Sequence, residues 1–372
     1  MTNIAALASG GVDSSVSIYL LKEMGYNPDM FYIKIGMEDM DTDYSCTQEE
    51  DLEMATAVAH KFGLKLNVVD LQKEYFDNVV SYVIKQVKRG LTPNPDVMCN
   101  RLIKFGAFND KVGKDYDKIM TGHYARVIEK DGKCWLGTAP DPVKDQTDFL
   151  AQIDTWQLNK AMFPIGDLSK QQVRDIAEKI NIAPAHRKDS QGICFLGKIN
   201  YNDFIEKYLG KLSGDIVEYE TGKIVGKHNG YWFHTIGQRR GLGLSSGPWY
   251  VCKKDITNNI VYVTTQHDFT KLFDKRGRDY RNDFIFLNTN IHWITENPFP
   301  NDNDICWKNG NNPEITFKIR HSPEFHTGTM HNLNGTWWIK TDENIGGIAP
   351  GQFCVIYDKD HKICYGSGEI QL

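Results

Sequence analysis

A short stretch rich in glycine and serine, SGGVDSS at Ser9–Ser15, separates two apolar runs near the start of the chain. The run before it, residues 3–9, predicts a buried strand, and apolar residues at helical spacing follow it as far as Gly25. A flexible loop between a strand and a helix lets the backbone approach an anion, which the positive helix N-terminus also attracts. The stretch therefore predicts an α/β fold with a phosphate site at the carboxyl edge of a parallel sheet.

The first 200 or so residues continue this alternation of strand and helix patterns. Two of the helical patterns open with capping pairs, Thr47 with Glu50 and Ser169 with Gln172. Strands and helices that alternate at this length predict a parallel sheet covered by helices on both faces. Further strands are predicted at residues 30–37, 64–71 and 117–125, and helices at residues 47–63, 76–90 and 169–180.

The pattern changes after about residue 210. Short segments rich in β-branched and aromatic residues alternate there with turn residues at hairpin spacing. We expect an α/β catalytic domain at residues 1–205, a small β-rich middle domain at residues 206–281 and a C-terminal β-barrel at residues 282–372.

Composition narrows the class of protein further. A chain of 372 residues suits two or three domains, and its net charge of −5 argues against general coating of nucleic acid but allows a local basic face. No apolar run reaches the roughly 18 residues that span a bilayer, and no basic leader precedes the first apolar stretch. Eight cysteines without a C-x-x-C pair fit a reducing compartment. We therefore expect a cytoplasmic protein with no membrane contact.

The loop at Ser9–Ser15 matches neither of two common nucleotide motifs. The Walker pattern G-x-x-x-x-G-K-[ST] and the dinucleotide pattern G-x-G-x-x-G are both absent there. A similar-looking stretch at residues 241–247, GLGLSSG, has the wrong spacing and a β-rich setting. The simpler alternative is a glycine turn that only packs the helix on the strand. SGGVDSS instead resembles the PP-loop of enzymes that cleave ATP between its α and β phosphates.

Two cysteines stand beside turn residues and cations. Helical spacing begins near Cys99 in TPNPDVMCNRLIKFGAF, and a thiol at a helix N-terminus is expected to have a lowered pKa. Asp96 lies three residues earlier and is placed to move a proton. Cys194 follows Arg187 and Lys188 on a glycine-flanked turn. The alternative for each cysteine is a buried packing residue.

Seven motifs occur in the order seen in bacterial tRNA-specific 2-thiouridylases, a family within the PP-loop superfamily, and the resemblance spans nearly the whole chain. They are SGGVDSS, TPNPDVMCNRLIKFG, TGHYAR, KDQTDFL, KDSQGICF, HTIGQRRGLG and APGQFCVIY. The resemblance implies transfer of AMP from ATP to the O2 atom of the wobble uridine in the tRNAs for glutamate, glutamine and lysine. Sulfur from a cysteine persulfide then replaces that oxygen, giving 2-thiouridine.

The same resemblance implies a role for individual residues. Cys99 would be the nucleophile, Cys194 the persulfide carrier and Asp96 a catalytic acid or base. The residues implied to hold ATP are Leu7, Ala8, Ser9, Gly10, Gly11, Val12, Asp13, Ser14, Ile33 and Gly122. Those implied to contact tRNA are Asn94, Pro95, Asp96, His123, Lys144, Asp145, Gln146, Ile319, Arg320 and Gln352.

The expected cofactors are ATP and Mg²⁺, with no resident metal site, because no histidine–cysteine cluster suggests zinc. The expected partners are tRNA and a cysteine desulfurase or relay protein that supplies sulfur. An iron–sulfur cluster held by Asp96, Cys99 and Cys194 remains an alternative that residue counting does not decide. The order of the sulfur steps is also open.

Two rival functions follow from the same motifs. A PP-loop enzyme that uses ammonia would need no reactive pair of cysteines and no RNA-binding barrel. A nucleotide-gated tRNA-binding protein would bind ATP without releasing pyrophosphate. The basic stretch HTIGQRRGLG and the tryptophans near it favour RNA binding, because RNA readers combine cations with stacking aromatic side chains.

Overall fold

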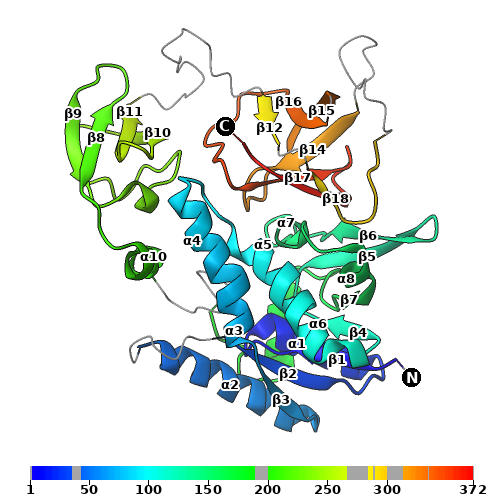
Figure 1. Ribbon diagram of the computed structural model, residues 1–372. Coiled ribbons are helices and arrows are strands. Elements are labelled where there is room, and N and C mark those ends of the chain that lie inside the picture. The colour runs from blue at the N-terminus through cyan, green and yellow to red at the C-terminus, as the bar shows by residue number, and fades with distance from the viewer. Residues whose placement is uncertain are drawn as a thin grey trace.

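The computed structural model describes residues 2–35, 43–188, 200–265, 284–287, 290–299, 313–333 and 335–371. Figure 1 shows an α/β domain at the bottom, a small green β domain at the upper left and a second β domain, yellow to red, at the upper right. The helices labelled α4 and α5 rise from the α/β domain toward the two β domains (Figure 1). This arrangement matches the three expected kinds of domain, while the expected borders at residues 205 and 281 stay predictions.

The α/β domain is built on a sheet whose neighbouring strands are all parallel. Its order is β3-β2-β1-β4-β7. Alternate residues of β1 enter different clusters, because Ala5 and Leu7 pack on one face and Ile4 and Ala6 on the other. Both faces are therefore covered, as expected for a parallel sheet. The strands are β1 (Ile4–Leu7), β2 (Asp29–Lys34), β3 (Leu66–Asp70), β4 (Lys118–Met120) and β7 (Ala161–Met162).

Helices from different parts of the chain cover the two faces. The face of Ile4 and Ala6 is covered by α1 (Val12–Glu23) and α2 (Asp43–Phe62), and α9 (Lys170–Lys179) packs beside α1. The capping box of Ser169 and Gln172 is confirmed. The expected start of the second helix at Thr47 is wrong, because α2 begins at Asp43.

The other face, that of Ala5 and Leu7, is covered by a nearly continuous run of short helices. They are α3 (Gln72–Tyr75), the π-helical η1 (Phe76–Val80), α4 (Ser81–Lys88), α5 (Pro95–Cys99), the π-helical η2 (Asn100–Ala107), α6 (Phe108–Lys111) and the 3₁₀ turn η3 (Gly113–Asp115). Further helices are α7 (Thr147–Leu150), α8 (Thr155–Lys160) and α10 (Tyr201–Leu209). Within the described ranges, no helix is both long and apolar enough to cross a membrane.

The middle domain is a small sheet in the order β10-β11-β8-β9. Its core is formed by Ile216, Val251, Val261 and Val263, on alternating strand positions. A 3₁₀ turn, η4 (Tyr231–Phe233), lies between β9 and β10 and contacts the α/β domain, because the Tyr231 hydroxyl donates to the Lys88 carbonyl at 2.7 Å. The strands are β8 (Gly214–Glu218), β9 (Ile224–His228), β10 (Tyr250–Asp255) and β11 (Ile260–Thr264).

The C-terminal sheet includes strands from the first half of the chain. Its order is β12-β16-β15-β14-β17-β18-β6-β5, with β13 on β18. The hairpin of β5 (Ala125–Lys130) and β6 (Lys133–Thr138) follows β4, and β6 pairs with β18 through Leu136 opposite Cys364. The other strands are β12 (Phe284–Phe286), β13 (His292–Trp293), β14 (Glu314–Lys318), β15 (His326–Leu333), β16 (Thr336–Thr341), β17 (Phe353–Tyr357) and β18 (Ile363–Glu369).

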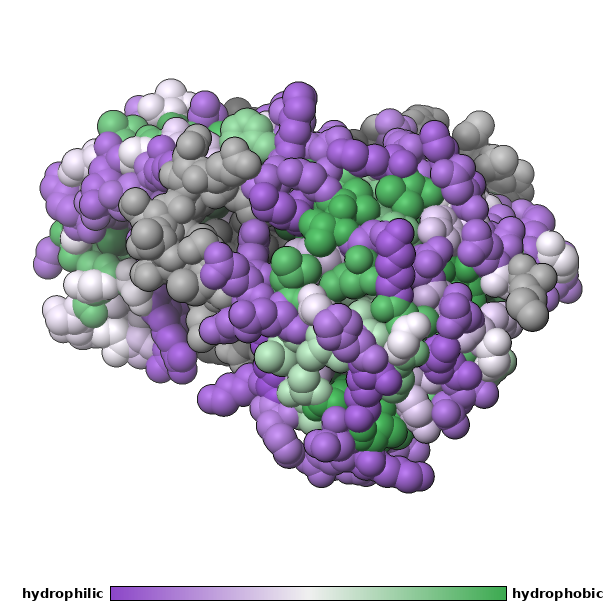
Figure 2. Space-filling model, turned by 90° about the horizontal axis from the view of Figure 1, so that it is seen from below, coloured by the Kyte–Doolittle hydropathy of each residue, from purple (hydrophilic) through white to green (hydrophobic). Residues whose placement is uncertain are grey.

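The face of the molecule seen from below combines two kinds of surface. Figure 2 shows hydrophilic residues over most of it, with hydrophobic residues gathered in patches between them. Scattered apolar side chains are normal on a folded surface. This face therefore supplies no argument for a particular partner.

Candidate active site

The glycine-rich loop lies where the order of the strands reverses. The chain runs from β1 outward through β2 to β3 and then returns to β4 on the other side of β1. Open α/β sheets bind ligands at this reversal, beyond the carboxyl ends of the strands. Gly122, two residues after β4, packs so closely that a Cβ there would lie 2.7 Å from the Ser14 amide nitrogen. The structure thus brings Gly122 to the loop, as the sequence predicts.

The backbone of the loop needs glycine at its tightest point. Gly10 has a φ of +73°, and a Cβ on it would lie 2.3 Å from the carbonyl oxygen of Asp51 in α2. Gly11 is the N-cap of α1 and provides no side-chain cap. Because the first-turn amides of a helix have no partner within the helix, they can bind an anion there.

Hydroxyl groups fix the shape of the loop. The Ser9 amide donates to Ser14 Oγ at 3.3 Å, and Ser14 Oγ lies 3.2 Å from both Ser9 Oγ and the Gly11 carbonyl oxygen. Ser15 Oγ donates to the same carbonyl at 2.8 Å. Ser9 is exposed, whereas Ser14 is buried. The serines therefore hold the loop in place, and Ser9 alone among these three presents its side chain to solvent.

Two cations and a phenol surround the loop, and local sequence patterns did not identify them as part of it. Lys170, the first residue of α9, donates to both carboxylate oxygens of Asp13 at 2.7 and 2.9 Å. The Tyr124 hydroxyl donates to Asp13 Oδ1 at 2.9 Å. Arg187 donates to the Gly10 carbonyl at 3.2 Å and pairs with Asp51 at 2.5 Å. Burial raises the pKa of Asp51, and the charge of Arg187 opposes this rise. Each of the two cations beside the loop is thus paired with a carboxylate.

The other residues predicted to hold ATP lie on the strands and the helix next to the loop. Leu7 ends β1 and Ile33 lies in β2, and both are buried. Ala8 donates its amide to the Phe31 carbonyl at 2.8 Å, and Val12 begins α1. The structure therefore places these residues on two adjacent strands and the loop between β1 and α1.

The helix that carries Cys99 begins earlier than the sequence predicted. The expected start near Cys99 is wrong, because α5 begins at Pro95 and its N-cap is Asn94, whose Oδ1 accepts from the Val97 amide at 3.3 Å. Proline suits the first helical position, where its missing N–H has no helical partner to lose. Cys99 therefore ends α5 and is not at the helix N-terminus, so that reason for a lowered thiol pKa is removed.

Cys99 is fully buried in the core of the α/β domain. It packs in the same cluster of buried side chains as Leu7 and Ile33, two residues predicted to bind ATP. The π-helical segment η2 follows directly, and π-helical turns are frequent at functional sites. Asp96 lies about one turn before Cys99 and is half-buried. This geometry keeps the thiol close to the sheet and shields it from solvent.

Cys194 lies outside the described residues, so its distance from Cys99 and its membership of a cluster are untested. Among the described residues, Arg187 donates to the Gly10 carbonyl at 3.2 Å, and the Arg187 carbonyl accepts from Arg174 at 2.7 Å.

One set of predicted tRNA contacts meets at the turn before α5. Gln352 donates from Nε2 to the carbonyls of Thr92 and Pro93 at 3.1 and 2.9 Å. A Cβ on Gly351 would lie 2.7 Å from Leu91 Cβ, so the two segments are in close contact. The C-terminal domain thus places Gln352 next to Asn94, Pro95 and Asp96.

A second set lies where the C-terminal sheet meets the segment before α7. Asp145 is 1 % exposed and accepts from Lys318, itself 0 % exposed, at 3.1 Å. The Ala139 amide also donates to Asp145. Lys144 and Gln146 are half-buried. In this conformation Asp145 fixes the segment to β14 and has no open surface for RNA.

The remaining predicted tRNA contacts differ in exposure. Ile319 is buried in the C-terminal core, whereas Arg320 is exposed and donates to the Gly347 carbonyl. His123 is buried, with Nδ1 2.8 Å from Thr121 Oγ1. Burial, and secondarily the charge of Lys104, hold the pKa of His123 well below its usual value, so the ring is neutral. Of these three side chains, only that of Arg320 faces solvent.

Metal binding can be assessed for the described residues only. Among them, no group of three His, Cys, Asp or Glu side chains could hold a metal ion. Mg²⁺ at nucleotide sites needs only one or two carboxylates beside the phosphates. Asp13 is the carboxylate that the loop carries, and Lys170 donates to both of its oxygens, so the residues fit a magnesium ion held mainly by the phosphates of a nucleotide.

The fold and the loop define a PP-loop type of α/β domain followed by two β domains, and the family models agree. Residues 2–198 match the model described as tRNA methyl transferase HUP domain, residues 202–265 the tRNA methyl transferase PRC-barrel domain, and residues 285–370 the aminomethyltransferase beta-barrel domain.

The chain is 59 % identical over 371 residues to tRNA-specific 2-thiouridylase MnmA 1 of Bacteroides thetaiotaomicron, covering 99 % of both chains. It is 57 % identical to tRNA-specific 2-thiouridylase MnmA of Parabacteroides distasonis, covering 99 % of this chain and 98 % of that one. An NMN synthetase from Francisella tularensis matches at 10 % identity and a TM-score of 0.33, over 57 % of this chain and 78 % of that one, too weakly to bear on this protein. The chain belongs to the tRNA-specific 2-thiouridylase family.

Proposed function

We propose that this protein is a tRNA-specific 2-thiouridylase that uses ATP to exchange O2 of the wobble uridine for sulfur. The observation that carries the proposal is the PP-type loop at the strand reversal, packed into one domain with the helix that bears Cys99. The proposed substrates are the tRNAs for glutamate, glutamine and lysine. The proposed setting is the cytoplasm, with domains at residues 1–205, 206–281 and 282–372.

The first step activates the uracil carbonyl, whose oxygen is a poor leaving group. The loop amides, Lys170 and Arg187 orient the triphosphate of ATP with its α-phosphorus toward the base. O2 of the uridine attacks that phosphorus, the bond to the bridging oxygen of the β-phosphate breaks, and pyrophosphate leaves. A magnesium ion beside Asp13 would neutralise phosphate charge when bound.

The second step transfers sulfur. The outer sulfur of a persulfide on Cys194 forms a bond to C2, and AMP departs with the original oxygen. Cys99 Sγ attacks the inner sulfur of Cys194 and forms a disulfide with it. The bond between the inner and outer sulfurs breaks, and its electron pair stays on the transferred sulfur, which becomes the thiocarbonyl. Asp96, about one turn from Cys99, accepts the proton that Cys99 loses. A reductant then opens the disulfide, and a cysteine desulfurase or relay protein reloads Cys194.

A pyrophosphate-release assay tests the proposal against its rivals. We expect release that requires tRNA, together with 2-thiouridine formed when a persulfide donor is added. Product formed from ammonia without a sulfur donor would favour an amide- or amidine-forming PP-loop enzyme. ATP binding without pyrophosphate would favour a nucleotide-gated binding protein. An absorption spectrum after anaerobic purification decides whether an iron–sulfur cluster takes part.

Replacing Lys170 with Met is expected to weaken ATP binding by about 10- to 100-fold, because a charged hydrogen bond contributes about 1.5–3 kcal/mol and the bare Asp13 carboxylate would repel phosphates. Isothermal titration calorimetry with ATP measures the change. Lys179→Met, at the exposed end of the same helix, is the matched control and should bind ATP as the wild type does. Equal affinities for all three proteins would remove Lys170 from the ATP site.

A further inference from the structure

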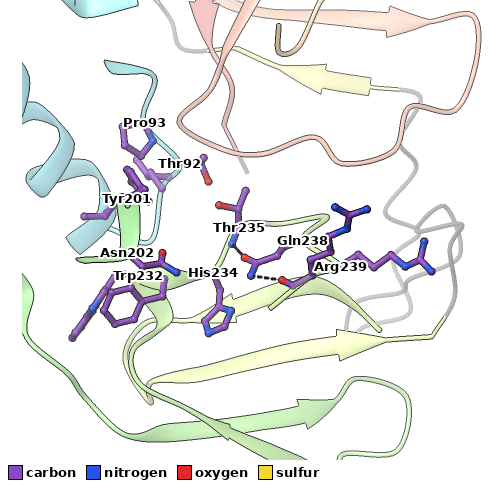
Figure 3. Close-up of a pocket in the computed structure, with 13 residues that line it drawn as sticks. Thr92, Pro93, Tyr201, Asn202, Trp232, His234, Thr235, Gln238 and Arg239 are labelled. Carbon is purple, nitrogen blue, oxygen red and sulfur yellow. Dashed lines mark hydrogen bonds between the residues drawn. The ribbon is translucent and has the colours of Figure 1, made fainter. Parts of the chain in front are cut away.

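A pocket of about 580 Å³ lies between the α/β domain and the middle domain. Its walls come from the end of α4 and the turn after it, from the start of α10, and from η4 with the segment that follows (Figure 3). Small-molecule sites usually have volumes of about 300–1,000 Å³. The pocket is therefore large enough for one nucleotide, and part of its wall comes from the stretch at residues 234–243 that the sequence predicts to favour RNA binding.

The two sides of the pocket differ in chemistry. Tyr201 and Trp232 lie on one side in Figure 3, with Pro93 beside them, and Arg239 lies on the other. Arg239 and Arg240 are exposed, and among the described residues neither forms an ion pair. An aromatic wall opposite guanidinium groups suits a ligand that has a flat base at one end and a phosphate at the other.

The basic side is held in shape before any ligand binds. Gln238 Oε1 accepts from the Thr235 amide at 3.0 Å, and Gln238 Nε2 donates to the Arg240 carbonyl at 3.0 Å (Figure 3). Gly237 and Gly241 have positive φ angles of +84° and +77°, which give this segment its tight turns. Binding here would require little ordering of the backbone, which favours affinity.

The pocket is bordered by residues already predicted to contact tRNA. Thr92 and Pro93 line it, and their carbonyls accept from Gln352 just before Asn94. On the basic side, a Cβ on Gly237 would lie 3.2 Å from the Cα of Gly347, whose carbonyl accepts from Arg320. Two predicted tRNA contacts therefore lie near segments of the pocket wall: Asn94 follows Pro93 in the chain, and Arg320 binds Gly347, which packs on Gly237.

We propose that the pocket binds one unstacked nucleotide of the tRNA anticodon loop, adjacent to the target uridine, with its base against Tyr201 and Trp232 and its phosphate against Arg239 and Arg240. The proposal rests on the proposed function, because it assumes that tRNA is the substrate. It adds a second nucleotide site, separate from the Asn94–Asp96 segment that is predicted to meet the target base. A free mononucleotide has the same chemistry, and the test separates the two sources.

Crosslinking tests the site in the intact chain. Transcripts of the lysine tRNA would carry 5-iodouridine at either nucleotide flanking the wobble position, and peptides would be mapped after irradiation. We expect one of the two transcripts to crosslink to Tyr201, Trp232 or Phe233, and excess uridine monophosphate to leave that crosslink in place. Crosslinks elsewhere, in a protein that still thiolates the tRNA, would overturn the pocket but keep the proposed function. If excess uridine monophosphate abolished the crosslink, the pocket would be a site for a free mononucleotide.

Arg239→Ala provides a second measurement. We expect tRNA affinity to fall about tenfold and the slope of log affinity against log salt to fall by about one, as for the loss of one phosphate contact. Lys223→Ala, on the β8–β9 turn of the same domain and away from the pocket, is the matched control and should keep wild-type affinity and slope. An unchanged slope for Arg239→Ala would contradict a phosphate contact. Failure of the wild type to bind any tRNA would overturn the pocket and the proposed function together.

Discussion

Replacing Cys99 with Ser is expected to lower 2-thiouridine formation by about 1,000-fold or more while the first round of tRNA-dependent pyrophosphate release is kept. A serine hydroxyl stays protonated at neutral pH and cannot form a disulfide with Cys194, so the reaction stalls once the persulfide sulfur has bonded to C2. Mass spectrometry of digested tRNA measures the product, and a coupled pyrophosphate assay measures the first half-reaction.

Cys134→Ser is the matched control, because Cys134 is half-buried at the β5–β6 hairpin and lies in none of the proposed roles. It should retain wild-type thiolation. Cys194→Ser is expected to behave as Cys99→Ser does. Full thiolation by both the Cys99 and the Cys194 variants would rule out the proposed pair of thiols, whatever their distance in the folded chain.

The second large effect is expected for Lys318→Met, which leaves the Asp145 carboxylate buried without its cation. Removing one partner of a buried ion pair typically lowers the free energy of unfolding by about 3–5 kcal/mol. Burial already raises the pKa of Asp145, and Lys318 opposes that shift. Urea denaturation followed by tryptophan fluorescence is suitable, since Trp337 and Trp338 lie on β16 of the same sheet.

Two further variants make this result interpretable. Lys133→Met breaks the exposed pair with Glu296 and should cost no more than about 1 kcal/mol. Lys318→Met combined with Asp145→Leu removes both charges and should recover most of the loss. A stability loss for Lys318→Met no greater than that for Lys133→Met would show that the buried pair is not what holds the segment before α7 to β14.

Local sequence patterns were sufficient for the parts of the fold that depend on near neighbours. The loop at Ser9–Ser15, the alternation of strands and helices and the capping box at Ser169 were all predictable, since each depends on residues within a few positions of one another. The helix start at Pro95 was missed, although a proline after an asparagine is itself a typical start. The fold class was therefore readable from the chain.

The residues that form the candidate site were harder to predict from the sequence, because their contacts join distant parts of the chain. Lys170 reaches Asp13 across 157 residues, and Asp145 meets Lys318 across 173. No periodicity or motif spacing encodes such pairs. The burial of polar side chains was equally unpredictable. Polar residues such as Asp145 and His123 usually lie on the surface, but both are buried in the structure. Local patterns predicted the loop, and the tertiary structure added the charged residues Lys170 and Arg187 beside it.

The antiparallel pairing of β6 with β18 has a consequence for synthesis on the ribosome. β6 ends at Thr138, whereas its partner strand is completed only at Glu369, almost at the end of the chain. At translation rates of about 5–20 residues per second, the emerging protein carries an unpaired strand edge for roughly 10–50 s. Such edges template aggregation. A fragment that ends before β18 would therefore keep the edge of β6 unpaired. Pairing with β18 thus also protects the chain against self-association through that edge.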